Sequence, residues 1–489
     1  MKETRLSSEI LQLEPKLVWK HLFALNQIPR CSGNEAGAAE YVISIAKKNN
    51  FKWRKDHVGN VVISVPATKG MEKRPAVVLQ GHLDMVCEKN KDTKHDFSKD
   101  PIRMMVKDGW VKADGTTLGA DNGIAVAMAL AVIEDETVVH PPLELLFTVD
   151  EETGLTGANE LKSDFLEGRV LLNIDSEEEG ALYIGCAGGL HTILKKQIDW
   201  THRHDDHETF LLKVDGLRGG HSGLNIHEGF GNAIKLLSRV LFNLKDEFHY
   251  HLASVSGGSK HNAIPREAEA VIDVPAGQVK RLQEIITQHN ATLKEELKFV
   301  DGSVKVSVEK HQQPEKVFST PFRDQLVGVL YAMPHGFMAM SQAIQGLVET
   351  STNMAVIKLK DGQVEMLTSQ RSSIGSGVRD IAAKIRALGE LGGFQVEQGG
   401  GYPAWEPNPS SHLLQTCKTI YKNKYGSEPH VKAIHAGLEC GIIGEKFEGM
   451  DMISFGPDIV GAHSPDERIK ISSVANVWDY LVEILKKIQ

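Results

Sequence analysis

The chain of 489 residues is 41% hydrophobic and 24% charged, which is the ordinary balance of a soluble globular protein and predicts two or more domains. Its formal net charge of −9 at pH 7 argues against nucleic acid as a partner, and it offers no basic signal for binding a membrane. The N-terminus precedes no apolar segment of a secretory signal, and the longest apolar run, residues 123–133, is too short to span a bilayer.

Five cysteines are scattered along the chain without a C-x-x-C pair, namely Cys31, Cys87, Cys186, Cys417 and Cys440. This spacing does not suggest a disulfide framework. We therefore expect reduced thiols in a cytoplasmic protein.

Helix and strand patterns alternate from the N-terminus to about residue 185, which is typical of βαβ units and a mainly parallel sheet. The expected elements are helices at residues 17–25, 38–46 and 123–133 and strands at residues 61–65, 77–80, 143–149 and 170–174.

The pattern changes after a glycine-rich break at residues 185–189. Strands and helices first alternate between residues 210 and 297. A similar order of helix, hairpin, helix and strand then recurs between residues 321 and 396, with the hairpin turning at Asp361-Gly362. This recurrence indicates a two-part α+β insertion, which a degenerate duplication would explain.

The α/β pattern resumes after the glycine-rich turn at residues 399–403, with a strand at residues 452–455 followed by a helix. The predicted fold is an α/β domain with a mainly parallel sheet and helices on both faces, interrupted by a two-part α+β domain. We place the α/β domain at residues 1–187 and 403–489 and the inserted domain at residues 188–402.

The apolar strand expected at residues 143–149 ends in three carboxylates, Asp150, Glu151 and Glu152. Acids at the mouth of a buried strand repel one another and resist desolvation, so a cation should offset them. A divalent metal ion is the strongest candidate, because carboxylate oxygens are its ligands.

Other apolar segments also stop at residues that can bind a metal. In open α/β sheets, ligands gather at the carboxyl ends of the strands, so we expect these residues to meet. A mixed set of histidines and carboxylates suits two metal ions that share a carboxylate and a water molecule. The five candidate ligands are His82, Asp121, Glu152, Asp175 and His463.

Two neighbouring acids are expected to assist these ligands. Asp84 lies two residues beyond His82, so on an extended segment its carboxylate can orient the imidazole. Glu151 should point away from Glu152 if that segment stays extended, which would leave it uncoordinated and able to take a proton from water.

Each of these residues also has a plainer interpretation. Any one of the 21 histidines is more often structural than functional, and Asp121-Asn122-Gly123 alone fits a turn that caps a helix. Glu151-Glu152 alone could be a solvated strand end. The glycine-rich stretches fit no phosphate-binding template. Five separate segments ending in metal-competent residues favour the metal site.

The chain resembles the co-catalytic zinc metallopeptidases of the dipeptidase, carboxypeptidase and aminoacylase superfamily over essentially its whole length, and within it the non-specific dipeptidases. The motifs that carry this resemblance, in order, are Gly81-His82-Leu83-Asp84-Met85-Val86, Gly119-Ala120-Asp121-Asn122-Gly123, Thr148-Val149-Asp150-Glu151-Glu152-Thr153-Gly154, Asn173-Ile174-Asp175, Gly219-Gly220-His221-Ser222-Gly223, His261-Asn262-Ala263-Ile264-Pro265, His435-Ala436-Gly437-Leu438-Glu439-Cys440-Gly441 and Gly461-Ala462-His463-Ser464-Pro465.

The resemblance implies a role for each candidate ligand. Asp121 would bridge two divalent metal ions per chain, Zn²⁺ first with Co²⁺ or Mn²⁺ as substitutes, and the peptide bond after it would be cis. His82 and Asp175 would complete one ion, and Glu152 and His463 the other. Glu151 would act as general base and then donate a proton to the leaving amine.

The resemblance also implies hydrolysis of unblocked dipeptides, including Xaa-His dipeptides, beneath a lid formed by the inserted domain. His221 would donate to the oxyanion and Arg371 would pair with the substrate carboxylate, assisted by Asn262 and by the backbone at His435 and Gly437. Without these motifs, His221 is an exposed residue in a turn and Arg371 a surface residue after a hairpin.

Two other functions remain open on the residues alone. An exo-carboxypeptidase or an N-acyl amino acid deacylase would share the ligands, whereas a non-catalytic metal-binding module would have no use for Glu151. The expected partners are small dipeptides, with no nucleic acid and no membrane, and a homodimer is left open. Because the lid looks doubled, we expect His221 to serve its own chain even in a dimer.

Overall fold

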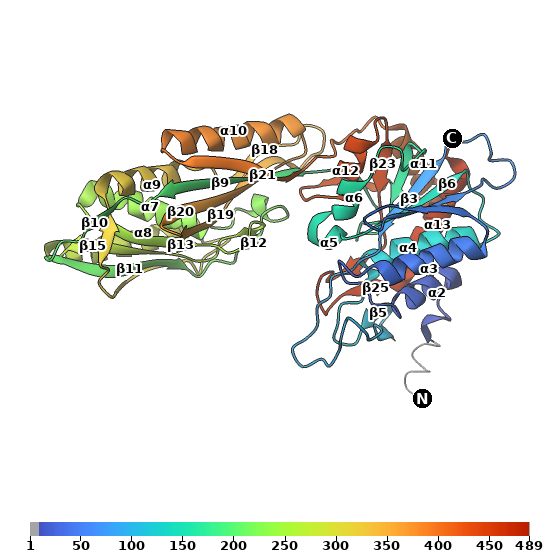
Figure 1. Cartoon of the computed structure of the whole chain (residues 1–489), viewed down its shortest axis with the longest axis horizontal. Coiled ribbons are helices and arrows are strands. Elements are labelled where there is room, and N and C mark those ends of the chain that lie inside the picture. The colour runs from blue at the N-terminus through green and yellow to red at the C-terminus, as the bar shows by residue number, and fades with distance from the viewer. Residues whose placement is uncertain (1–8, 489) are drawn as a thin grey trace. The chain divides into compact units, whose positions relative to one another are not determined.

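The computed structural model describes residues 9–488, which separate into two compact units (Figure 1). The second unit consists of Cys186–Glu406 and Ile434–Gly437, and the first contains the rest of the described chain. The chain enters the second unit at residue 186, where the sequence suggested 188, and leaves it after residue 406, where the sequence suggested 402. The short return at Ile434–Gly437 has no signal in the hydrophobic pattern.

An eight-stranded sheet forms the centre of the first unit. Its four middle strands, β6, β3, β7 and β23, are parallel, and antiparallel strands flank them. Every residue of β3 and β6 is buried, which explains their continuous apolar sequence. In spatial order the strands are β1 (Lys52–Lys55), β2 (Val61–Val65), β6 (Leu143–Thr148), β3 (Val77–His82), β7 (Val170–Asn173), β23 (Asp451–Ser454), β8 (Ala181–Cys186) and β22 (His430–Ile434).

Helices pack around this sheet as the α/β pattern predicted. Helix α4 lies against β3 and α2 and is apolar on all sides, since every residue from Asn122 to Val132 is buried. No helix in the described part of the chain is long and apolar enough to cross a membrane. The helices are α2 (Lys16–Leu25), α3 (Ala36–Lys48), α4 (Ala120–Glu134), α5 (Glu151–Gly154), α6 (Thr156–Glu160), α11 (His412–Tyr425), α12 (Glu439–Lys446) and α13 (Ile471–Lys487).

A second, four-stranded sheet joins early and late parts of the chain. Strands β24 (Ile459–Val460) and β25 (Arg468–Lys470) add to the hairpin of β4 (Met104–Lys107) and β5 (Trp110–Ala113). Pairing of β25 with β5 fixes the loop between β24 and β25, which carries His463.

The carboxylate of Glu134 ties three helices together. Lys20 Nζ lies 2.7 Å from its Oε2 and Lys48 Nζ 2.8 Å from its Oε1, while the Glu134 side chain is only 6% exposed. Burial alone would raise the pKa of Glu134, but the two lysines outweigh it and hold the pKa at about 2. The ionised carboxylate of Glu134 should therefore stabilise the folded protein.

Glu134→Gln is expected to lower the free energy of unfolding by about 1–2 kcal/mol at neutral pH, because two charged hydrogen bonds are lost while both lysines stay hydrated. Since the folded-state pKa lies below the unfolded value, this stabilisation is complete above about pH 4.5 and is lost as the pH falls toward about 2. Urea unfolding at about pH 7 and about pH 3 measures the difference in free energy of unfolding between the wild type and Glu134→Gln, and this difference should be smaller at the lower pH. The exposed Glu136→Gln is the control, and a gap independent of pH would contradict the assignment.

The expectation that all cysteines are reduced was wrong, because Cys31 and Cys87 form a disulfide. The partners are 56 positions apart, so local spacing could not reveal them. A parallel bridge between Cys31 and Met85 brings the chain after β3 beside the segment that precedes α3. The other three cysteines are buried and take no part in this disulfide.

The second unit is built on a nine-stranded sheet whose main path has the order β16-β11-β15-β13-β19-β20-β9-β21, with β18 paired to β19. The elements are β9 (Gly188–Gln197), β11 (His207–Asp215), α7 (Ala233–Glu247), β13 (His251–Gly257), β15 (Ala268–Pro275), α8 (Val279–Glu296), β16 (Lys305–Lys310), α9 (Thr320–Ala332), β18 (Gly336–Met340), β19 (Val348–Lys360), β20 (Gln363–Ser372), α10 (Gly375–Leu391) and β21 (Gln395–Tyr402).

Two halves with the same element order make up this unit. Each half runs strand, helix, antiparallel strand pair, helix and strand. Equivalent strands follow one another in opposite order across the sheet, as β16-β11-β15-β13 in the first half and β19-β20-β9-β21 in the second. The halves meet where β13 pairs with β19, with Gly257 opposite Ile357. The first strand of the second half, β9, precedes the whole first half in the chain. The pattern that recurs between residues 321 and 396 therefore does not contain this strand.

One helical layer covers one face of this sheet, because α8, α7, α9 and α10 contact one another in that order (Figure 1). Phe210, Leu212 and Val214 of β11 belong to the core beneath the helices. The alternate residues His207 and Thr209 therefore face the opposite side of the sheet.

Candidate metal centre

His82 ends β3 with its imidazole buried and held by Asp84. Nδ1 of His82 lies 3.2 Å from Oδ1 of Asp84. The Asp84 carboxylate also accepts hydrogen bonds from the Ser32 hydroxyl at 2.7 Å and from the backbone N–H groups of Glu151 and Glu152. Burial would raise the pKa of Asp84, but His82 first, and then the Ser32 and backbone donors, outweigh it and lower the pKa to about 2. Asp84 stays ionised and leaves Nε2 of His82 free for a ligand.

Asp121 lies between two histidines at the start of α4. Its Oδ1 is 3.3 Å from Nε2 of His82, and its Oδ2 is 3.2 Å from Nε2 of His463. The peptide bond between Asp121 and Asn122 is cis, as the resemblance implied. One carboxylate thus offers each oxygen to a different histidine, which is the arrangement that a bridging ligand needs.

Two further carboxylates complete the two sides. Asp175, just after β7, places Oδ1 3.5 Å from Nε2 of His82. Glu152 places Oε2 2.9 Å from Nε2 of His463. The ligand atoms therefore form one group of His82, Asp121 and Asp175 and another of Asp121, Glu152 and His463, each with all atoms within 4.8 Å of one another.

The chemistry of these donors fits two divalent ions. Asp175 Oδ1 and Glu152 Oε1 are buried without a hydrogen-bond partner. The carboxylates of Asp121 and Glu152 raise the pKa of His463 to about 11, and burial, reinforced by the charges of Asp121 and Glu152, raises the pKa of Asp175 to about 6. Both shifts reflect a concentration of negative charge that bound cations would offset.

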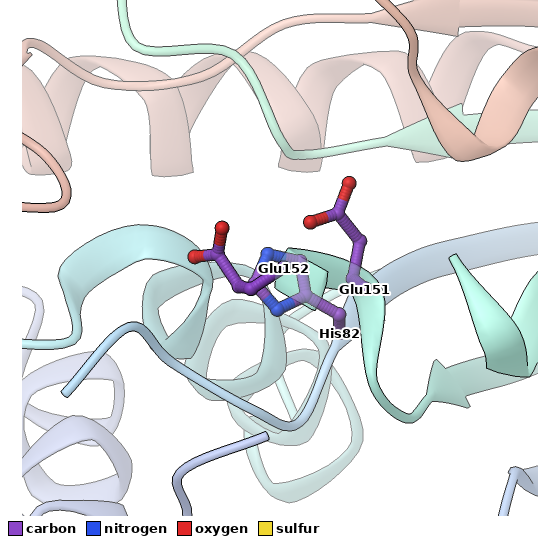
Figure 2. Close-up of side chains that lie close together, drawn as sticks. All are labelled: His82, Glu151 and Glu152. Carbon is purple, nitrogen blue, oxygen red and sulfur yellow. The ribbon is translucent and has the colours of Figure 1, made fainter. Parts of the chain in front are cut away.

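Glu151 lies beside this centre, but not in the way that an extended segment predicted. Asp150 adopts a left-handed backbone with φ 52°, and the chain then turns into the helical turn α5. Figure 2 shows the side chains of His82, Glu151 and Glu152 gathered together, and one ligand atom from each lies within 4.8 Å of the others. Burial, reinforced by the neighbouring acids, raises the pKa of Glu151 well above its ordinary value. A carboxylate with a raised pKa suits a proton acceptor.

Several supporting residues were not predicted from the sequence. Glu467 accepts hydrogen bonds from the four consecutive backbone N–H groups of residues 118–121, at 2.7 to 3.1 Å. The buried Arg30 donates to the backbone oxygens of Leu83, Asp84 and Gly119. Glu439 is fully buried on Gln80 and Thr148, and burial raises its pKa to about 7. Of these, only Glu439 lies in a motif that the sequence singled out.

The residues predicted to bind substrate lie together in the second unit. His221 belongs to β12 (Gly220–His221), and its Nδ1 accepts from the backbone N–H groups of Gly223 and Leu224. Burial and the nearby Arg371 lower the pKa of His221 to about 4, so the neutral ring carries its proton on Nε2. His221 is therefore prepared to donate a hydrogen bond.

Arg371 and the short segment 434–437 lie beside His221. Arg371 is 7% exposed; its Nη1 donates to the Tyr402 hydroxyl at 2.7 Å, and its Nε has no partner. His435 Nε2 lies 2.7 Å from the Ser351 hydroxyl, and burial followed by Arg371 lowers its pKa to about 3. A Cβ at Gly437 would meet the Tyr402 ring at 2.7 Å, which explains the glycine. The backbone oxygen of Asn262 accepts a hydrogen bond from Ser222 N–H at 2.8 Å.

Known proteins resemble this chain over nearly its whole length. The chain is 43% identical over 481 residues to the cytosol non-specific dipeptidase of Escherichia coli, covering 98% of this chain and 99% of that protein. It is 41% identical to the crystal structure of aminoacylhistidine dipeptidase from Vibrio alginolyticus, with a TM-score of 0.92 and coverage of 100% and 99%. The fold alone is shared with aminopeptidase PepT from Bacillus cereus, at 14% identity, a TM-score of 0.57 and coverage of 97% and 99%. A family model matches residues 78–487, so this chain belongs to peptidase family M20/M25/M40.

Proposed function

We propose that this protein hydrolyses the amide bond of unblocked dipeptides, including Xaa-His dipeptides, with two divalent metal ions, Zn²⁺ first and Co²⁺ or Mn²⁺ as substitutes. The observation that carries the proposal is the pair of ligand groups that share Asp121, with Glu151 beside them. The substrate class rests on the names of the two relatives that are 43% and 41% identical over nearly the whole chain.

Each residue of the centre has a role in this reaction. His82 and Asp175 would hold one ion, Glu152 and His463 the other, and Asp121 both. When bound, the ions would polarise the scissile carbonyl and lower the pKa of a water molecule between them. Glu151 accepts a proton from that water as its oxygen attacks the carbonyl carbon. After the C–N bond breaks, Glu151 returns the proton to the leaving amine.

The second unit would supply recognition of the substrate. We propose that Nε2–H of His221 stabilises the oxyanion and that Arg371 binds the substrate carboxylate, assisted by Asn262, His435 and Gly437. Two properties support these roles, namely the neutral His221 ring and the unpartnered Nε of a nearly buried guanidinium. The partners would be small dipeptides in the cytoplasm, as the relative's name suggests, and each chain, alone or in a homodimer, would use its own His221.

A substrate panel tests the reaction. The metal-loaded protein should cleave dipeptides and leave tripeptides and N-acetyl amino acids nearly untouched, and a chelator should abolish cleavage. Release of single C-terminal residues from longer peptides would instead indicate a carboxypeptidase, and cleavage of acetylated amino acids a deacylase. If the metal-replete protein cleaves no substrate of the panel, the remaining interpretation is a non-catalytic metal-binding module.

Arg371→Lys tests the carboxylate contact. The variant keeps the charge but loses the planar fork, so it should raise KM for free dipeptides by about tenfold and for dipeptide amides by much less. Steady-state kinetics on matched pairs of acid and amide provide the measurement, and Arg379→Lys on α10 is the control. An equal rise on both substrates would show that Arg371 does not bind the carboxylate.

A further inference from the structure

Five buried nitrogen and oxygen atoms without hydrogen-bond partners lie together in the first half of the second unit. Such atoms are scarce in folded proteins, and each calls for an explanation such as an ion or a water molecule. In the candidate metal centre, the partnerless oxygens belong to two of the proposed ligands, Glu152 and Asp175. The proposed reaction does not use the group in the second unit, which consists of Arg203 Nε, His207 Nδ1, both ring nitrogens of His251 and Asp273 Oδ2.

Strand register brings these residues together. On β15, Asp273 lies opposite Thr209 of β11 on one side and opposite His251 of β13 on the other. His207 precedes Thr209 by two positions and so shares its face, away from the helical layer. On that face Asp273 is 0%, His251 3% and His207 7% exposed. The register therefore creates a buried polar site on the side of the sheet opposite the helices.

Three imidazole rings form a nearly equilateral triangle here. The ring centroids are 5.1 Å apart for His204 and His207, 5.3 Å for His204 and His251, and 5.6 Å for His207 and His251. Imidazoles bound to one tetrahedral ion at about 2.0–2.1 Å have centroids about 5 Å apart, so the rings are close enough to share an ion, while their ligand atoms are not yet gathered within 4.8 Å of one another. His249 adds a fourth ring, 4.8 Å from that of His251.

A buried carboxylate stands behind one of these rings, as it does behind His82. Nδ1 of His207 lies 3.3 Å from Oδ2 of Asp273, close but not aligned as a hydrogen bond. The other oxygen of Asp273 accepts from the Thr209 hydroxyl at 2.8 Å. A carboxylate on Nδ1, itself hydrogen-bonded, is the usual support of a metal-bound histidine and directs Nε2 to the ion. Arg203 Nε lies 3.7 Å from Asp273 Oδ1 and balances its charge.

The protonation and exposure of the cluster suit a cation. Burial and the neighbouring His249 lower the pKa of His251 to about 4, so the ring is neutral and able to bind a metal. Neither of its nitrogens has a well-aligned hydrogen bond, although the backbone of Phe318 tends to raise the pKa of the ring. His204 is exposed beside the exposed acids Asp205 and Asp206, which attract a cation to the opening.

We propose that this histidine cluster binds one divalent transition-metal ion of the Zn²⁺, Ni²⁺ or Cu²⁺ class through His204, His207 and His251, independently of the metal centre in the first unit. Asp273 orients His207, and His249 lies at the open side. Imidazole nitrogens are the ligands that these ions favour. Among the described residues, ligand atoms gathered within 4.8 Å occur in the first unit, and this cluster is looser. Binding therefore includes an inward turn of the exposed His204.

Elemental analysis after dialysis against micromolar free Zn²⁺ tests the stoichiometry. The wild-type protein should hold one ion more than His204→Ala or the double variant His204→Ala with His207→Gln, while dipeptide hydrolysis stays unchanged. His311→Ala, an exposed histidine outside the cluster, should hold as many ions as the wild type. Asp121→Ala should keep the ion of the cluster. Equal zinc content in wild type and His204→Ala would overturn the proposal.

A spectroscopic test identifies the ligands without relying on activity. One equivalent of Cu²⁺ added to the zinc-loaded protein should give an electron paramagnetic resonance spectrum with hyperfine coupling to several imidazole nitrogens. The coupling should weaken in His204→Ala and disappear in His204→Ala with His251→Gln. If the buried substitution unfolds the second unit, shown by circular dichroism, the exposed pair His204→Ala and His249→Ala replaces it. An unchanged spectrum in the variants, or binding only at millimolar copper, would show an adventitious ion only.

Discussion

Asp121→Ala should lose two metal ions relative to the wild type and all measurable dipeptide hydrolysis. The Asp121 carboxylate offers Oδ1 to the side of His82 and Oδ2 to the side of His463, so its removal takes a ligand from both ions at once. Elemental analysis of the purified variant measures the loss. The physical reason extends beyond the missing ligand, because His82 and His463 would then face a cavity that lacks the shared negative charge.

Single-sided ligands provide the control for this substitution. In the proposed assignment Asp175→Ala removes a ligand from the ion of His82, and Glu152→Ala removes one from the ion of His463, so each variant should lose one ion more readily than the other. Retention of both ions in Asp121→Ala would mean that another residue bridges them, and the assignment would be abandoned.

Glu151→Gln should keep both metal ions and lower kcat by about 10²–10⁴-fold, because the amide cannot accept a proton from water. This substitution also distinguishes a general base from a metal ligand. An atom of Glu151 lies within 4.8 Å of ligand atoms of His82 and Glu152, so the residue could in principle bind an ion itself. A variant that loses a metal ion together with its activity would identify Glu151 as a ligand.

The matched comparison is Glu439→Gln. Glu439 is another buried acid, and it is one of the charges that raise the pKa of Glu151. Loss of its charge should move the acid limb of the kcat/KM profile to lower pH, because one repulsive neighbour of the base is gone. Turnover close to the wild-type value in metal-replete Glu151→Gln would end the assignment of the general base.

Continuous apolar runs made the central strands predictable. The strands around β3 and β6 were placed to within one or two residues, because both faces of each strand are buried. The hairpin at Asp361-Gly362 was also confirmed, since Asp361 and Gly362 adopt positive φ values of 51° and 75°.

Features that depend on contacts between distant segments could not be predicted in this way. The disulfide of Cys31 and Cys87 follows from the pairing of two loops, and the four hydrogen bonds to Glu467 follow from the path of the chain after His463. The extended segment considered for Glu151 does not form, because Asp150 turns left-handed and ends the strand, which periodicity cannot show. The structure brings the five predicted ligands together, and their roles stay predictions until the variants are measured.

The joining of the two halves at β13 and β19 has a consequence for solubility at high concentration. The pairing of β13 with β19 covers one edge strand of each half and leaves β16 and β21 at the ends of the path. The edge strand β16 exposes Lys305, Glu309 and Lys310, and β21 breaks its register between Gly399 and Tyr402. Charged and irregular edges discourage the addition of a strand from another molecule. Crowded molecules should therefore resist cross-chain sheet extension, although the unit is built on so broad a sheet.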